Sequence, residues 1–84
     1  MAEILYFASL AETLGMKSEQ IELSQNCKTV ADLVKLLSAR GDPFDGAFAG
    51  STRILVAINQ EMSEPAANIR NTDEIAFFPP VTGG

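Results

Sequence analysis

The sequence predicts a small α+β domain in which a mixed β-sheet is crossed by one main helix. Short apolar runs stand at residues 4–8, 54–58 and 74–78, and one long amphipathic pattern begins at Thr29. The chain has 84 residues, 46% of them hydrophobic, which is the length of one domain. A domain of this size buries roughly 60–65% of its unfolded surface, which is enough for a modest core.

The first apolar run predicts a strand that leads into a short helix. Residues 4–8 read Ile-Leu-Tyr-Phe-Ala, a compact run typical of a strand buried on both faces. Ser9 and Glu12 then have the Ser-x-x-Glu spacing of a capping box, and Gly15 is a typical helix stop. We therefore expect a short helix over residues 10–14.

A half-exposed strand and the main helix follow. Residues 20–23 alternate between polar and apolar side chains, which predicts a strand with one exposed face. Thr29 is a suitable helix cap, and Asp32 stands at the third helical position, where it can complete a capping box. Gly41 ends the helix. One apolar stripe with helical spacing marks its buried side: Val30, Leu33, Val34 and Leu37.

The second half of the chain predicts a helical turn and a hairpin. Asp42 is placed to cap a turn of helix over residues 43–48, with proline at the favoured first position. Residues 54–58 are apolar throughout, which predicts a strand covered on both faces. Asn-Gln at residues 59–60 predicts a turn, and a short edge strand is expected at residues 61–63.

Residues 74–78 predict the final strand, which Pro79 and Pro80 end because proline lacks the backbone donor. The order is thus strand, strand, helix, strand, short strand, strand. The first and last strands are among the most apolar, so they belong side by side at the centre of the sheet. This is the β-grasp, or ubiquitin-like, arrangement, although other small α+β folds share such patterns. We expect a β-grasp domain at residues 1–78 and an extended tail at residues 79–84.

The chain ends in two glycines, Gly83 and Gly84. Glycine has no side chain, so such a tail can thread a narrow channel and bring its carboxylate to an active site in another protein. Activation of that carboxylate with ATP would give an acyl-adenylate, which a sulfur or nitrogen nucleophile can attack. The competing interpretation is a frayed terminus without a role.

The charge and the cysteine content limit the binding partners and the cellular compartments that we expect for the chain. The formal net charge of −5 disfavours non-specific nucleic-acid binding. No apolar run is long enough to span a membrane, and the first residues lack the pattern of a signal peptide. The single cysteine, Cys27, leaves no internal disulfide framework and fits a reducing cytoplasm.

Composition also limits the chemistry that the chain can perform alone. It has no histidine, so neither a Ser-His nor a Cys-His pair can form. One thiol without imidazole does not make a zinc site, and no glycine-rich phosphate loop is present. We therefore expect no metal and no bound cofactor, and a component on which other proteins act rather than an independent enzyme.

The tail also carries a specific resemblance. Residues 73–84 read Asp-Glu-Ile-Ala-Phe-Phe-Pro-Pro-Val-Thr-Gly-Gly, which resembles the C-terminal signature of the MoaD family, the small subunits of molybdopterin synthase. Residues 4–8 and 54–60 are similar to that family's opening and middle strands. The family often has glycine where Thr72 stands, and Asn71 could supply a positive-φ turn position instead.

The resemblance implies a sulfur carrier. An adenylating partner, similar to the ubiquitin-activating enzymes, would use ATP to convert the Gly84 carboxylate to an acyl-adenylate, and a sulfur donor would then leave a thiocarboxylate. The large synthase subunit would receive the tail, with Pro80, Val81, Thr82 and Gly83 entering its active site. There the sulfur would attack cyclic pyranopterin monophosphate, and two rounds would build the dithiolene of molybdopterin. The family also implies a heterotetramer built on a large-subunit dimer.

Phe7 and Phe78 match family positions on an apolar sheet face that meets the partners. The alternative interpretation is that both are ordinary core aromatics, since a small domain must bury most of its five phenylalanines. Tyr6 is expected in the core with its hydroxyl at the sheet edge. Cys27 has two interpretations as well. It could carry a persulfide, with Lys28 lowering the pKa of its thiol, or it could be a tolerated small residue before a helix.

Three other functions share these features. A sulfur carrier for thiamine or for tRNA thiolation uses the same terminus with another acceptor, although thiamine carriers are usually shorter and lack Phe-Phe-Pro-Pro. A ubiquitin-like modifier would join Gly84 to lysines through isopeptide bonds. A non-covalent ubiquitin-like module would have an inert tail, so deletion of Gly84 would not impair its function.

Overall fold

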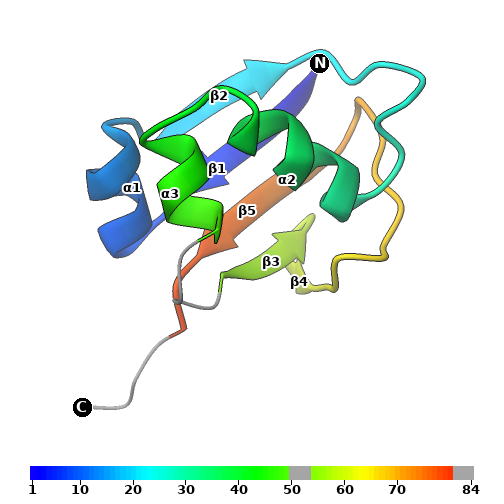
Figure 1. Ribbon diagram of the computed structural model, residues 1–84. Coiled ribbons are helices and arrows are strands. Elements are labelled where there is room, and N and C mark those ends of the chain that lie inside the picture. The colour runs from blue at the N-terminus through cyan, green and yellow to red at the C-terminus, as the bar shows by residue number, and fades with distance from the viewer. Residues whose placement is uncertain (50–53, 81–84) are drawn as a thin grey trace.

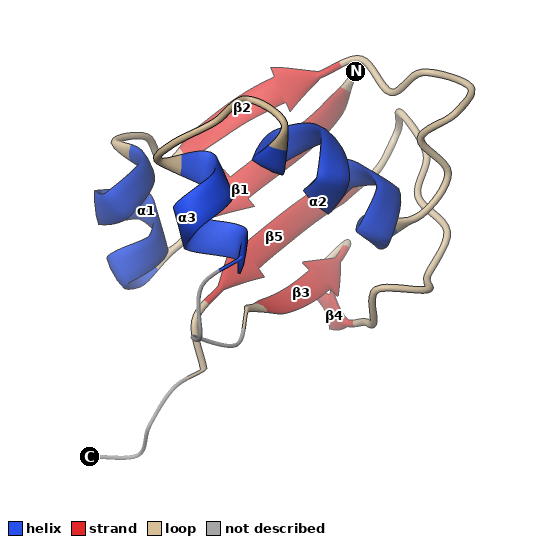
Figure 2. Ribbon diagram, viewed as in Figure 1, coloured by secondary structure: helices blue, strands red, loops and turns tan. Residues whose placement is uncertain are grey.

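The computed structural model describes residues 1–49 and 54–80, which form a five-stranded mixed sheet with three helices against it (Figures 1 and 2). The expected α+β class is confirmed. In chain order the elements are β1 Ala2–Tyr6, α1 Ala8–Leu14, β2 Ser18–Ile21, α2 Val30–Ser38, α3 Phe44–Ala49, β3 Leu55–Ile58, β4 Glu61–Met62 and β5 Glu74–Phe78.

The sheet has the strand order β2-β1-β5-β3-β4, so the first and last strands are neighbours near its centre, as expected. β1 and β5 run parallel, with Tyr6 opposite Phe77. The β1–β2, β3–β5 and β3–β4 pairs are antiparallel. A parallel central pair needs a crossover, and α2 lies across the sheet within that connection (Figure 1).

The described helices lie against one face of the sheet (Figure 2). In β1 alternate residues are the buried ones, whereas in β3 and β5 the small Ala57 and Ala76 on the other face are buried as well. Tyr6 and Phe77 are almost completely buried against the helical layer, whereas Phe7 is exposed. The expectation that residues 4–8 are buried on both faces is wrong, because Phe7 and Ala8 are exposed. Residues 54–58 are all buried or half-buried, although no described helix covers their second face. Their apolar residues cover two different surfaces, a core and an open sheet face.

α1 begins earlier than expected. Phe7 is its cap residue and makes no side-chain capping bond, so the predicted Ser9–Glu12 capping box is wrong. The amide of Phe7 still donates to the carbonyl of Phe77, at 3.1 Å, and Ala8 then turns the chain with φ of 54°. Gly15 ends the helix with φ of 75°, as expected. β2 likewise lies two residues before its predicted position, at Ser18–Ile21.

The predicted capping box of α2 is confirmed. Thr29 Oγ1 accepts a hydrogen bond from the Asp32 amide at 3.2 Å, and Asp32 Oδ2 accepts one from the Thr29 amide at 3.1 Å. Backbone hydrogen bonds from Lys28 and Thr29 lower the pKa of Asp32. Of the apolar stripe, Val30, Leu33 and Leu37 are buried and Val34 is half-buried.

α3 and the turns show how polar side chains fix the connections. Asp42 Oδ1 accepts from the Gly46 amide at 3.1 Å, and α3 begins at Phe44, one residue later than the predicted helix. Asn59 and Gln60 both have positive φ, 51° and 70°, which is the geometry of a tight hairpin turn. That predicted turn is confirmed, and β4 follows it.

Asn71 does not adopt the positive φ expected of it. Its side chain instead pairs with the backbone of Leu23: Oδ1 accepts from the Leu23 amide at 2.8 Å, and Nδ2 donates to the Leu23 carbonyl at 3.4 Å. The Asp73 carboxylate closes the adjacent turn by accepting from the Arg70 amide at 2.8 Å. The turn before β5 is thus held by side chains, and Thr72 needs no glycine in its place.

Candidate partner-binding face and tail exit

β5 delivers the chain to the tail at one end of the sheet. The strand ends at Phe78, Pro79 is half-buried and Pro80 is exposed, so the backbone has left the sheet at this point (Figure 2). The remaining residues of the predicted tail site, Val81, Thr82, Gly83 and Gly84, lie outside the described residues. The exit end of the sheet is therefore the part of the candidate site that the structure places.

An apolar surface lies on the open sheet face beside this exit. The register that pairs Tyr6 with Phe77 sets Phe7 beside Phe78, and Leu55 lies opposite Phe78 on the other side. Phe7 is 48% exposed, and Phe78 and Leu55 are half-buried. We call the following residues, which share this face, the apolar end: Leu5, Phe7, Leu55, Ala57, Met62, Ala76 and Phe78.

The aromatic residues of the chain are thus divided between two surfaces. Tyr6 and Phe77 stack at 6.3 Å between ring centroids, and Phe44 and Phe48 complete this group on the helical side. Phe7 and Phe78 belong to the open face, so the alternative that both are core aromatics is wrong. Sequence reasoning missed their neighbours Leu5, Leu55 and Met62, although strand alternation could have found them.

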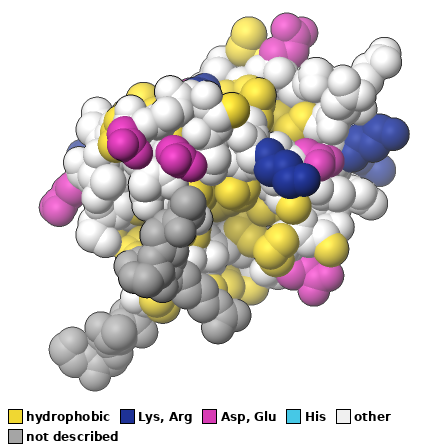
Figure 3. Space-filling view, in the orientation of Figure 1, with side chains coloured by type: hydrophobic (Ala, Val, Ile, Leu, Met, Phe, Trp, Pro, Cys, Tyr) yellow, Lys and Arg dark blue, Asp and Glu magenta, His cyan; other side chains and the backbone are white. Residues whose placement is uncertain are grey.

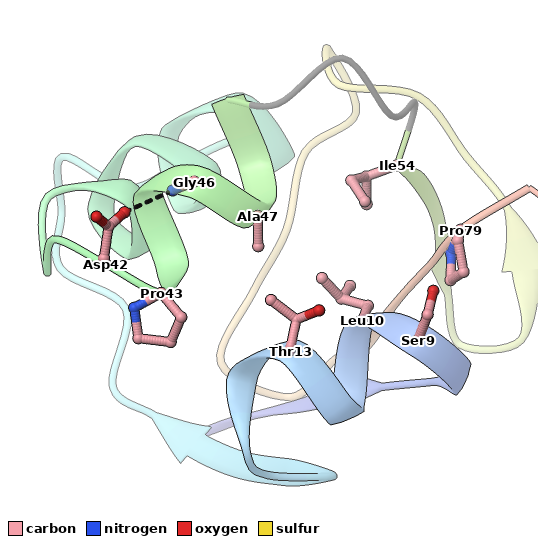
Figure 4. Close-up of a pocket in the computed structure, with 9 residues that line it drawn as sticks. All are labelled: Ser9, Leu10, Thr13, Asp42, Pro43, Gly46, Ala47, Ile54 and Pro79. Atoms are coloured by element: carbon pink, nitrogen blue, oxygen red, sulfur yellow. Dashed lines mark hydrogen bonds between the residues drawn. The ribbon is translucent and has the colours of Figure 1, made fainter.

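A hollow of about 490 Å³ lies on the helical side of the same exit (Figure 4). Leu10, Ala47 and Ile54 point toward it, and Pro79 borders it where β5 ends. The carboxylate of Asp42 at its rim is occupied by the Gly46 amide. The hollow therefore offers apolar contact near the tail and no pair of groups suited to acid–base chemistry.

A second apolar area reaches the surface between α2 and β3 (Figure 3). Val34, Phe48 and Pro65 contribute to its lining, with Lys35 at the border. It lies on the helix-covered side, so it is separated from the apolar end by the thickness of the sheet.

Tyr6, Glu19 and Arg40 form a polar cluster on the helical side of the sheet. Tyr6 is 2% exposed, and its hydroxyl donates to Glu19 of the edge strand β2 at 2.7 Å, as expected for a core tyrosine whose hydroxyl reaches the sheet edge. Burial, followed by the hydrogen bond and charge of Glu19, raises the pKa of Tyr6. Arg40 binds the same carboxylate and lies 4.8 Å from the Phe44 ring centroid. We interpret this cluster as structural and call it the clamp, because it joins the sheet to the segment between α2 and α3 through Tyr6, Glu19, Arg40 and Phe44.

Cys27 is buried, and burial raises the pKa of its thiol, with the charge of Asp32 acting in the same direction. The expectation that Lys28 lowers this pKa is wrong, because the desolvation of the thiolate dominates. A thiol that resists ionisation is a poor nucleophile, so the structure favours the tolerated-residue interpretation.

Within residues 1–49 and 54–80, no group of histidine, cysteine, aspartate and glutamate side chains is arranged to hold a metal ion. None of the helices described is both long enough and apolar enough to cross a membrane.

The five-stranded mixed sheet with its helices on one face defines the class: a ubiquitin-like β-grasp protein. The chain belongs to the ThiS family, whose model matches residues 4–84. This supports the resemblance drawn from the tail and strands.

Two relatives align with the whole of the chain and over their own full length. The molybdopterin synthase sulfur carrier subunit of Haemophilus influenzae is 38% identical, and that of Escherichia coli is 33% identical, each over 84 residues. The crystal structure of SAMP1 from Haloferax volcanii superposes with a TM-score of 0.76 at 29% identity, covering 99% of this chain and 98% of that one.

Proposed function

We propose that this chain is the sulfur carrier subunit of a molybdopterin synthase. One observation carries the proposal: the similarity to two carrier subunits of that name extends over the entire chain, including the Gly83-Gly84 end. The projecting exit of β5 supports it, since a carrier must present its terminus beyond the folded body.

The proposed chemistry takes place at Gly84. Its carboxylate attacks the α-phosphate of ATP in an adenylating partner, which releases pyrophosphate and gives an acyl-adenylate. A sulfur nucleophile from a donor then displaces AMP and leaves a thiocarboxylate. The charge of that group resides largely on a soft sulfur atom, so the carrier needs no base of its own, in keeping with a chain that has no histidine. ATP belongs to the partner, and the carrier binds no cofactor.

The proposed acceptor is cyclic pyranopterin monophosphate in the large subunit of the synthase. Pro80, Val81, Thr82 and Gly83 enter that subunit's active site, where proximity supplies much of the rate. Pro79 and Pro80 lower the entropy cost of ordering the tail. Two rounds of transfer build the dithiolene, and the catalytic groups come from the large subunit. We place this reaction in the cytoplasm.

The apolar end is the proposed docking surface for the large subunit. It is adjacent to the tail exit, so a partner that covers Phe7 and Phe78 also receives the tail. An exposed apolar patch bordered by polar residues is typical of a protein interface. Large aromatic side chains commonly supply most of the binding free energy at such a surface.

A protein modifier is the second candidate function. The likeness to SAMP1, a small archaeal modifier protein, favours it. In that case an amine of a target lysine, rather than sulfur, would attack the activated Gly84 and form an isopeptide bond. Cells that produce a tagged chain would then accumulate high-mass conjugates that isopeptidases remove.

Reconstitution distinguishes the two functions. The chain is incubated with ATP, a sulfur source, the host's adenylating enzyme, the large subunit and the pterin substrate, and dithiolene product is measured. We expect product with the full chain and none after deletion of Gly84. Isopeptidase-sensitive conjugates in cells, without product in vitro, would favour the modifier.

A further inference from the structure

Pro79 is the first residue beyond the central strands, and the chain is held on both sides just before it. On one side, the amide of Phe7 donates to the carbonyl of Phe77 at 3.1 Å, which extends the contact of β1 with β5 to the end of the sheet. On the other side, Leu55 lies opposite Phe78. The position from which the tail departs is therefore fixed by the sheet.

The ring of Pro79 faces the helical side of this exit. Successive residues of a strand point to opposite faces, and Phe77 is buried in the core while Phe78 lies on the open face. Pro79, one residue further on, returns to the side of Phe77. This agrees with its place in the lining of the hollow at the tail exit (Figure 4).

The hollow gives the ring an apolar wall. Leu10 of α1 is 4% exposed and belongs to the core, and Ile54 is half-buried and packs against the same core. Both line the hollow together with Pro79, and Figure 4 shows them with Ser9 at the end of it away from Asp42. We call Ser9, Leu10 and Ile54 the Pro79 seat.

The two prolines of the exit therefore differ. Pro79 is half-buried at its seat, whereas Pro80 is exposed. The ring of Pro79 restricts its own φ, and the proline that follows restricts its ψ to extended values. Once the seat holds the ring, the direction in which the chain continues is fixed relative to the sheet.

This direction matters at the reacting atom. Gly84 is five residues beyond Pro79 in the sequence, a reach of at most about 18 Å. For an extended chain of that length, a change of about 20° at its base moves its end by about 6 Å. A displacement of that size is far larger than group transfer tolerates.

We propose that Pro79 is a positioning residue for sulfur transfer: its ring, held by the seat, sets the direction in which the tail enters the large subunit. The inference rests on the proposed function. Docking through the apolar end does not depend on the direction of the tail, but the fraction of docked carriers that can react does. Pro79 should therefore act on the rate of transfer within the complex, and Pro80 should contribute stiffness only.

The test is a single-turnover reaction of the thiocarboxylated carrier with an excess of its large subunit and cyclic pyranopterin monophosphate. Intact mass confirms the thiocarboxylate in each variant and then follows its loss. The dependence of the rate on subunit concentration separates the affinity from the rate constant at saturation. We expect Pro79→Ala to lower that rate constant about tenfold and to change the affinity less than about threefold.

Three further variants separate the seat from the stiffness of the chain. Pro79→Val keeps an apolar side chain for the seat and should recover most of the loss. Pro80→Ala should lower the rate constant less than about threefold, because it leaves the seat occupied. Ile54→Ala removes part of the seat without altering the tail, so its loss and that of Pro79→Ala should be less than additive.

The matched control is Pro65→Ala, which removes an exposed proline from the connection between β4 and β5 and should change neither quantity by more than about twofold. A thermal melt verifies that each variant is folded at the assay temperature. A slow transfer that follows the melting temperature rather than the seat would overturn the proposal.

Equal losses in Pro79→Ala and Pro80→Ala would assign the effect to stiffness and overturn the proposal as well. A loss confined to the affinity, or additive losses in Pro79→Ala and Ile54→Ala, would do the same. If the thiocarboxylate of the original chain gives no dithiolene product, the proposed function fails together with this inference. If it gives product and Pro79→Ala reacts equally fast, this inference alone fails.

Discussion

The hydroxyl of Tyr6 donates a 2.7 Å hydrogen bond to Oε2 of Glu19, which joins the central strand β1 to the edge strand β2. Both oxygens of that carboxylate also accept from the guanidinium of Arg40, at 2.8 and 2.9 Å. The guanidinium lies over the Phe44 ring, at 4.8 Å from its centroid. One carboxylate thus connects the sheet to the segment between α2 and α3.

Arg40→Ala should lower the free energy of unfolding by about 1 kcal/mol. The ion pair is partly exposed and screened by solvent, so its share is small, and the contact with Phe44 adds a similar amount. Urea denaturation of the isolated chain measures the loss. Arg70→Ala, at an exposed arginine outside this cluster, is the control and should have no measurable effect. Equal losses in the two variants would contradict the clamp.

Stability should also fall in acid. Burial alone would raise the pKa of Glu19, but hydrogen bonds from Arg40 and Tyr6 and the charge of Arg40 hold it below its ordinary value. The unfolded chain therefore binds this proton more readily than the folded chain. The stabilisation is present above the ordinary carboxyl pKa of about 4.3 and is lost as the pH falls through the lower folded value.

Unfolding free energies measured from neutral pH down to strongly acid pH check this dependence. Glu19→Gln should be less stable than the original chain at neutral pH, and its acid limb should be shallower. An acid limb of unchanged steepness would assign the loss to other carboxylates.

Phe77 and Phe78 should respond differently to the same substitution. Phe77 is 1% exposed in the core, so Phe77→Ala should cost about 3–5 kcal/mol of folding free energy. Phe78→Ala on the open face should cost under about 1.5 kcal/mol. Its principal effect should be weaker binding to the large subunit, measured by titration calorimetry. Global unfolding of Phe78→Ala in a thermal melt would show that the residue serves the core instead.

Cys27→Ala should leave sulfur transfer unchanged. The thiol is buried and its pKa is raised, so it is ill suited to carry a persulfide. The folded chain should also react slowly with a thiol reagent and rapidly after denaturation. Loss of transfer in a Cys27→Ala chain that still melts cooperatively would restore the persulfide interpretation.

The sequence predicted those features that depend on local chemistry. The Thr29–Asp32 box, the Gly15 stop and the Asn59-Gln60 turn each arise from residues close in the chain, and each occurs in the structure. The central pairing of β1 and β5 was also predicted, because apolar runs that open and close a β-grasp domain meet in the sheet.

The predictions that were wrong concern features that tertiary contacts determine. An apolar run such as residues 4–8 does not reveal whether its second face is covered by a helical layer or left open, so the sequence alone does not distinguish the open face from the core. The predicted capping box at Ser9 does not form, because the hydrogen bond from Phe7 to the Phe77 carbonyl ends the strand there and α1 begins at Ala8. The pairing of the Asn71 side chain with the Leu23 backbone cannot be predicted locally either, since the two residues are far apart in sequence.

Intact-protein mass spectrometry tests the central claim most directly. The full chain is incubated with ATP, a sulfur source and the host's adenylating enzyme, with a chain lacking Gly84 as the control. We predict a mass gain equal to the exchange of one oxygen for one sulfur, absent from the control. No gain in a chain shown to be intact to Gly84, with an enzyme active on a known carrier, would contradict the assignment as a sulfur carrier.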